Sequence, residues 1–139
     1  MKVRSIGVKE VHCASPDATL TDIATMMRNY GVGSVPICEG DKLVGLVTDR
    51  DIAVACIAND RSGSTCVAHD YMAKPLHTIS PDTDIKRAAK IMSDNQIRRL
   101  PVIERGKLVG MISLGDLALA LKDDDKLVAE TLRNISEIS

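Results

Sequence analysis

The sequence predicts an α+β fold made of two β-α-β-β-α units packed about a pseudo-twofold axis. Three observations predict it: an internal repeat, helical periodicity in each copy, and two short strands joined by a tight turn. At an offset of 65 residues, Ser15-Pro16-Asp17 recurs as Ser80-Pro81-Asp82, and Lys42-Leu43-Val44-Gly45 recurs as Lys107-Leu108-Val109-Gly110. Two copies are too few for an open solenoid, which needs three or more stacked units, so we expect them to close on each other.

Each copy opens with a short apolar segment, residues 11–14 and 76–79, which the Ser-Pro-Asp turn ends. A helix follows, because apolar residues then recur at i, i+3, i+4 and i+7, and we expect these residues to lie in the core. Thr19 and Asp84 are the predicted N-caps, and Asn29-Tyr30-Gly31 and Asp94-Asn95 the predicted ends. The apolar positions are Leu20, Ile23, Ala24 and Met27 in copy one, and Ile85, Ala88, Ala89 and Met92 in copy two.

Two strands come next in each copy, at residues 34–38 and 42–48 and again at 99–103 and 107–113. The first strand of each pair contains a proline, which favours an edge position or a break. Gly40-Asp41 and Arg105-Gly106 are predicted to turn the chain. Glycine inside a strand marks close backbone approach or a bulge. Close approach at Gly45 and Gly110 could come from a helix or a ligand, and packing favours the helix. A second helix is predicted to begin near Asp49 and near Leu114.

The expected division of the chain is copy one at 1–58, a polar linker at 59–67, copy two at 68–122, and a helical tail at 123–139. In the tail, Val128, Leu132 and Ile135 share one helical face. This face could pack against the repeats or cover a dimer interface.

Composition narrows the function classes. Of 139 residues, 45% are hydrophobic and 27% charged, which suits a packed globular protein. The net charge of −1 and the absence of Phe and Trp argue against nucleic-acid binding, which needs positive charge and often aromatic stacking.

No apolar run suits a signal peptide or a membrane span, so we expect a cytoplasmic protein without membrane contact. The cysteines, Cys13, Cys38, Cys56 and Cys66, form no C-x-x-C pair and are expected to be thiols in a reducing compartment.

A hydroxyl and an acid recur three residues apart at the predicted strand-to-helix corners. They are Thr48 and Asp51 in copy one, and Ser113 and Asp116 in copy two. One interpretation is a capping box at the helix start. The other uses the same residues for a ligand, because the corner can hold a phosphate while the acid accepts hydrogen bonds from two vicinal hydroxyls of a ribose. The sequence leaves both interpretations open.

Arginines lie close to these corners. Arg50 precedes Asp51, and Arg98-Arg99 precedes the proline strand of copy two, where copy one has Gly33-Ser34. They could form a solvated basic face, or they could recognise phosphate, which guanidinium groups bind well.

The doubled motifs resemble those of a tandem pair of CBS domains, the module named after cystathionine β-synthase. The resemblance covers essentially residues 1–122 and is strongest to short stand-alone bacterial proteins of this type. The motifs are CASPDATL and TISPDTDI, VGSVPI and RRLPVI, and GDKLVGLVTDRDI and GKLVGMISLGDL. The lead-in of copy two, His69-Asp70-Tyr71-Met72, fits the family's D-x-M pattern, whereas copy one has Ser5-Ile6-Gly7.

The resemblance implies a sensor of adenosyl compounds, such as AMP, ADP, ATP, S-adenosylmethionine or NAD, that regulates a partner protein and assembles as a homodimer. In the family, the S/T-x-x-D element holds phosphate and ribose, and aliphatic residues hold the adenine. No obligatory cofactor or metal is implied. Carried over to this chain, the site of copy one is Cys13, Ala14, Val35, Pro36, Thr48, Arg50 and Asp51, and that of copy two is Thr78, Ile79, Arg98, Arg99, Leu100, Pro101, Ser113 and Asp116.

Other functions remain as alternatives. A ligand-independent interaction or dimerisation module would use the same fold. An enzyme is not expected, because the repeated His12 and His77 have no acid or nucleophile at a recognisable spacing. Both histidines are expected to be structural.

Overall fold

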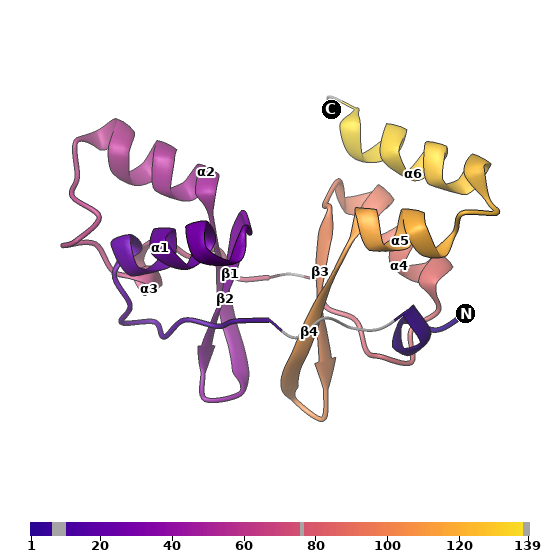
Figure 1. The fold of residues 1–139 in the computed structure, drawn as a ribbon, viewed down its shortest axis with the longest axis horizontal. Helices are drawn as coiled ribbons and strands as arrows, with labels where there is room; N and C mark the ends of the chain where they lie inside the picture. The colour runs from indigo at the N-terminus through magenta and orange to yellow at the C-terminus, as the bar shows by residue number, and fades with distance from the viewer. Residues whose placement is uncertain (7–10, 76, 138–139) are drawn as a thin grey trace. The chain divides into compact units, whose positions relative to one another are not determined.

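The computed structural model describes residues 1–6, 11–75 and 77–137, and its α+β architecture confirms the predicted fold class (Figure 1). Gly7 of the first lead-in, Leu76 of the predicted strand 76–79 and the last two residues of the predicted tail lie outside the described residues. The chain forms two compact units, one of residues His12–Leu76 and one of Met1–Val11 with His77–Ser139. In the described part, no helix is long and apolar enough to cross a membrane.

The unit of residues 12–76 contains one antiparallel hairpin. Its strands are joined by the predicted turn at Gly40-Asp41. Ser34 lies opposite Thr48, and a bulge falls between Ile37 and Cys38. The elements are α1 (Leu20–Tyr30), β1 (Ser34–Glu39), β2 (Lys42–Thr48), α2 (Asp49–Asp51), its helical continuations η2 (Ile52–Cys56) and η3 (Ile57–Asn59), and α3 (Ala68–Tyr71).

The second unit repeats this plan and adds a C-terminal helix. Arg99 lies opposite Ser113, and a bulge again interrupts the hairpin, between Val102 and Ile103. The elements are η1 (Val3–Ile6), α4 (Ile85–Asn95), β3 (Arg99–Glu104), β4 (Lys107–Ser113), α5 (Leu114–Ala120) and α6 (Asp125–Ser136).

The expected first strand of each copy is shorter than the sequence predicts. Ala14 forms a single parallel bridge with Ile37, and Ile79 forms the equivalent bridge with Val102. The other strands and helices lie where they were predicted. The Ser-Pro-Asp turn follows Ala14 and Ile79 at once, which leaves room for one bridge only.

The first helix of each copy begins at its predicted cap. Thr19 Oγ1 accepts a hydrogen bond from the Asp22 N–H at 3.1 Å, and Asp84 Oδ1 accepts one from the Lys86 N–H at 2.8 Å. The predicted ends are also correct: α1 ends at a left-handed Gly31 (φ 64°), and α4 ends after Asn95.

Each unit has its own aliphatic core. In the second unit, the predicted core residues Ile85, Ala88, Ala89 and Met92 are all buried. In the first unit, Leu20 and Ile23 are buried and Met27 is half-buried, but the prediction for Ala24 is wrong because Ala24 is exposed. The difference follows from α6, which packs on α4 and has no counterpart on α1 among the described residues of the first unit.

The tail therefore packs against copy two, one of the two alternatives open from the sequence. Ile135 is buried in the core and Val128 is partly buried against it. Leu132, predicted on the same face, is 49% exposed and does not join them.

The two copies exchange their lead-in segments, residues 1–6 and residues 66–71. The first lead-in completes the core of copy two through the fully buried Val3, and the second completes that of copy one through the fully buried Ala68. The backbone hydrogen bonds of the two lead-ins form three pairs that correspond at the 65-residue offset. The Val3 N–H donates to Thr83 O (2.8 Å), as the Ala68 N–H does to Ala18 O (2.9 Å). The Arg4 N–H donates to Pro81 O (2.8 Å), as the His69 N–H does to Pro16 O (3.0 Å), and Met1 O accepts from the Ile85 N–H (2.9 Å), as Cys66 O does from the Leu20 N–H (2.9 Å).

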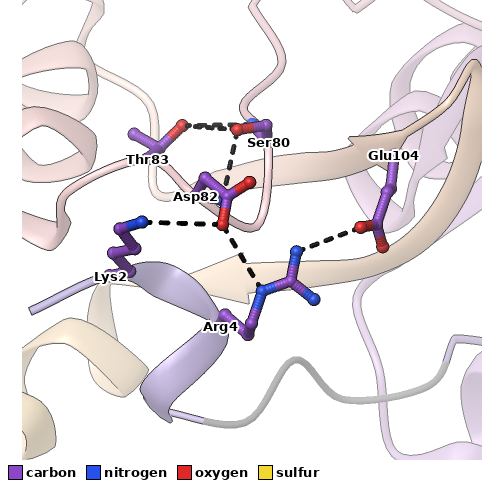
Figure 2. A network of polar contacts seen from close by, with 6 residues as sticks. All are labelled: Lys2, Arg4, Ser80, Asp82, Thr83 and Glu104. Carbon is purple, nitrogen blue, oxygen red and sulfur yellow. Dashed lines mark hydrogen bonds and ion pairs between the residues drawn. The ribbon is translucent and has the colours of Figure 1, made fainter.

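Charged side chains add to the first of these contacts. Figure 2 shows Arg4 between two acids, with its Nη2 3.0 Å from Glu104 Oε1 and its Nε 3.4 Å from Asp82 Oδ1. Lys2 Nζ lies 3.9 Å from the same Asp82 oxygen. The hydrogen bond to Glu104 raises the pKa of Arg4 above its ordinary value. These exposed pairs add little stability, because solvent screens them and both side chains lose conformational freedom.

Met72, the last residue of the D-x-M motif, explains the glycine in β2. A Cβ at Gly45 would overlap the Met72 side chain. The expected helix beside Gly45 is α3, which contacts β2, and the side chain that requires the glycine is that of its C-cap residue, Met72. The D-x-M pattern of the lead-in places this methionine.

Val3→Ala should lower the free energy of unfolding by about 2 kcal/mol, because it removes buried methyl groups and leaves a cavity. Urea unfolding followed by far-ultraviolet circular dichroism measures this loss. The matched control is Val32→Ala, since Val32 is 43% exposed and should change stability by less than about 0.5 kcal/mol. Equal effects of the two substitutions would contradict the proposed role of Val3.

Asp84→Ala should lower the melting temperature at pH 7, and the difference from wild type should shrink at acidic pH. The Lys86 N–H, followed by the N-terminal ammonium group, lowers the pKa of Asp84. A lowered pKa gives stability that is present above the ordinary carboxyl pKa and is lost as the pH falls through the Asp84 value. Melting curves from pH 7 to pH 2 test this. Asp84→Asn keeps an acceptor but cannot titrate, so its melting temperature should lack this pH dependence.

Candidate functional site

The strand-to-helix corner of copy one is closed by Thr48 and Asp51. Thr48 Oγ1 accepts a hydrogen bond from the Asp51 N–H at 3.1 Å, and Asp51 Oδ2 accepts one from the Thr48 N–H at 2.9 Å. Both residues are half-buried. Two backbone N–H groups at the end of β2 and the start of α2 are thereby satisfied.

Copy two builds the same corner with Ser113 and Asp116. Ser113 Oγ accepts from the Asp116 N–H at 3.1 Å, and Asp116 Oδ2 accepts from the Ser113 N–H at 2.8 Å. The capping interpretation of the repeated motif is therefore confirmed in both copies. The capping role does not by itself decide the ligand interpretation, because a capping carboxylate can accept more than one hydrogen bond.

The residues predicted to contact adenine lie beside each corner, on the segment before the Ser-Pro-Asp turn and on the proline strand. They are called the adenine wall below. In copy one the Ala14 N–H donates to Pro36 O at 2.9 Å, and in copy two the Ile79 N–H donates to Pro101 O at 3.0 Å. The structure therefore brings the two predicted wall segments of each copy together. Ala14, Val35, Pro36, Ile79, Leu100 and Pro101 are buried, whereas Cys13 and Thr78 are exposed.

The hairpins bring the proline strands to the corners. Ser34 is opposite Thr48 in β1 and β2, and Arg99 is opposite Ser113 in β3 and β4. Arg98 O accepts a hydrogen bond from the Leu114 N–H at 2.8 Å, so both arginines of copy two lie at the corner and their side chains are exposed. Arg50 is exposed in the first turn of α2.

The corner of copy one holds an acid that the sequence reasoning missed. The Asp49 N–H donates to Gly33 O at 2.9 Å, and its carboxylate lies over Gly33, with Oδ2 3.1 Å from where a Cβ would stand. Copy two has Leu114 and Arg98 at these positions. The 65-residue alignment pairs Asp49 with Leu114 and Gly33 with Arg98, and this reversal of charge was the available signal.

Two hollows lie elsewhere in the unit of residues 12–76. One of about 360 Å³ is lined by Arg61, Asp70 and Tyr71 among others, and one of about 250 Å³ lies over Leu20, Ala24 and Ile57. Neither contains a predicted site residue. The predicted wall and corner residues of each unit are brought together by backbone pairing.

His12 and Cys13, both considered in the sequence analysis, contact other side chains of copy one. The ring of His12 stacks on that of Tyr30, with centroids 3.8 Å apart and planes inclined by 7°. Cys13 Sγ lies 3.3 Å from Cys38 Sγ, a pairing that the sequence did not indicate.

Comparison with known proteins agrees with these motifs. The CBS domain family model matches residues 3–58 and 67–123. The CBS domain-containing protein YhcV of Bacillus subtilis is 35% identical over 134 residues, which span 96% of this chain and 94% of YhcV.

Solved structures share the fold. A protein with CBS domains from Burkholderia ambifaria has a TM-score of 0.79 and 25% identity, over 89% of this chain and 96% of that one. The CBS domain protein PAE2072 of Pyrobaculum aerophilum, solved as a complex with AMP, has a TM-score of 0.77 and 22% identity, over 88% of this chain and 99% of that one. With two matches of the family model and a relative similar over nearly its whole length, this chain belongs to the CBS domain family and carries two copies of the domain.

Proposed function

We propose that this protein is a regulatory module that binds an adenosyl nucleotide of the AMP, ADP, ATP, S-adenosylmethionine or NAD type and acts on a partner protein. One observation carries the proposal: each copy keeps a hydroxyl, a carboxylate and an aliphatic wall together at one corner. The AMP complex of PAE2072 supports it, since that protein shares the fold.

Each group has a role in the proposed site. The carboxylate of Asp51 or Asp116 accepts hydrogen bonds from the ribose hydroxyls, and Thr48 or Ser113 contacts the phosphate or the sugar. The wall around Pro36 or Pro101 covers the adenine. A nucleotide that binds one conformation or assembly more tightly than another shifts the equilibrium between them, which is how binding would reach the partner.

The two sites are proposed to differ in their preference for phosphate. Copy two places Arg98 and Arg99 at the corner, and guanidinium groups form strong charge-assisted hydrogen bonds with phosphate. Copy one places the Asp49 carboxylate over Gly33, which repels an anion. We therefore assign the phosphorylated ligand to copy two first.

A second candidate, a ligand-independent interaction module assembled as a homodimer, has its own support. Val54 and Leu119 occupy equivalent positions on the second helices and are 50% and 78% exposed, and Ile57 is 65% exposed. Exposed aliphatic side chains recurring at equivalent positions suit protein contact. The capping boxes alone account for the repeated hydroxyl and acid under this candidate.

Asp116→Ala should abolish or strongly weaken AMP binding, measured by isothermal titration calorimetry, and Asp51→Ala should do so for any second, weaker site. Each substitution also removes a helix cap, so a matched control is needed. Asp22→Ala removes the same kind of cap, with Thr19 at the start of α1, but lies outside the proposed sites. It should lower the melting temperature and leave AMP affinity unchanged. Retained AMP affinity in the Asp51→Ala/Asp116→Ala double variant would exclude the ribose role.

Arg98→Ala/Arg99→Ala should weaken AMP binding by about 10- to 100-fold, the loss expected for one charge-assisted hydrogen bond of about 1.5–3 kcal/mol. Adenosine, which has no phosphate, should bind the variant and the wild type equally. Arg105→Ala is the control, because Arg105 is exposed at the hairpin turn of copy two. An equal loss for AMP and adenosine would show that the arginines do not read the phosphate.

A wild-type protein that is folded and dimeric but shows no heat of binding with any of the five adenosyl compounds would favour the interaction module. Val54→Glu/Leu119→Glu should then convert the dimer to a monomer in analytical ultracentrifugation.

A further inference from the structure

Two thiol groups of copy one lie within hydrogen-bond distance of each other. Cys13 Sγ and Cys38 Sγ are 3.3 Å apart, and all four cysteines of the chain are thiols. Cys13 is exposed, whereas Cys38 is only 7% exposed. A reagent in solution can therefore reach Cys13 Sγ, whereas Cys38 Sγ is buried next to it.

The backbone fixes this approach from both sides of Ala14. The Ala14 N–H donates to Pro36 O and the Cys38 N–H donates to Ala14 O, both at 2.9 Å. The bulge between Ile37 and Cys38 changes the direction of the side chain that follows it. A disulfide S–S bond is about 2.05 Å long, so the sulfurs have to approach by a further ~1.2 Å.

The two sulfurs differ in reactivity. Burial, with the hydrogen bond to Cys13 and nearby negative charge, raises the pKa of Cys38 to about 12. Cys38 is therefore a thiol at neutral pH, and thiols are much weaker nucleophiles than thiolates. Cys13 is the sulfur that an oxidant reaches first, because it is the exposed one.

We propose that Cys13 and Cys38 form a reversible intrachain disulfide in response to a hydroperoxide. The Cys13 thiolate attacks the peroxide O–O bond, so Cys13 becomes a sulfenic acid and the peroxide leaves as hydroxide, which takes up a proton to form water. Cys38 sulfur then attacks the Cys13 sulfur and displaces hydroxide, which takes the Cys38 proton and leaves as a second water. Overall, two thiols and one hydrogen peroxide give one disulfide and two waters. An excess of a small thiol reverses the bond by exchange and is itself oxidised to its disulfide.

Other residues of the chain serve as internal controls for this cysteine pair. At the equivalent positions copy two has Thr78 and Ile103, so the disulfide belongs to copy one alone. Cys56 and Cys66 are buried in the core of the same unit, where Cys56 Sγ donates to Arg61 O at 3.4 Å and Cys66 Sγ lies 3.2 Å from Tyr71 Oη. The inference does not rest on nucleotide binding, although Cys13 belongs to the proposed adenine wall.

The test uses the full chain, fully reduced, treated with one molar equivalent of hydrogen peroxide and then with N-ethylmaleimide. Trypsin places the four cysteines in four different peptides, of residues 10–28, 29–42, 51–61 and 62–86, so mass spectrometry identifies every pairing. We expect a 10–28/29–42 cross-link, an intact mass lower by two hydrogen atoms, and a melting temperature several degrees higher, all reversed by dithiothreitol.

Variants separate the steps. Cys38→Ser should stop at a Cys13 sulfenic acid that dimedone captures, and Cys13→Ser should leave Cys38 reduced. The control Cys56→Ala/Cys66→Ala should form the cross-link as wild type does. A wild-type protein that stays reduced, that pairs Cys56 with Cys66 instead, or that joins two chains through Cys13 would overturn the proposal.

Discussion

Burial of an exchanged segment is the interaction on which both units depend. Each core is aliphatic and small, and each is completed by a residue from the lead-in segment of the other copy, Val3 or Ala68. Burial of a valine side chain is worth about 1.5–3 kcal/mol, a large share of the stability of a small unit. The hydrogen bonds that hold the two segments match at the 65-residue offset, so the exchange is a property of the repeat and not of one copy.

The same residues serve the fold and the proposed ligand site. Each corner needs a hydroxyl and an acid because the end of the strand and the start of the helix leave backbone N–H groups to satisfy. Once those groups are satisfied, the side chains are fixed in position, and a ligand would meet a preformed set of acceptors. In this chain the candidate site therefore lies at a position that folding already requires. The differences between the copies, Asp49 and Gly33 against Leu114 and Arg98, lie around the corner and leave the corner itself intact.

Much of this structure was predictable because it is local. Hairpins, helix caps and corners depend on residues a few positions apart, and the sequence placed them correctly. The repeat showed that residues 1–6 and 66–71 are equivalent, but a period does not say against which copy each segment packs. Ala24 was wrongly placed in the core because α6 covers only one of two equivalent helices. The bulge beside Gly45 was one of the alternatives that the strand glycine offered, but no residue pattern indicated that Cys13 approaches Cys38.

The exchange also sets an order of events during synthesis. Residues 12–76 are continuous, so their unit can form as soon as they have left the ribosome. The other unit needs residues 1–6 together with residues 77–137, and at roughly 5–20 residues per second these leave the ribosome on the order of 10 s apart. During that interval the side chain of Val3 has no core to enter. Residues 1–6 are therefore synthesised first but are among the last to pack in a core. The second unit is completed only after translation has reached the C-terminal helix.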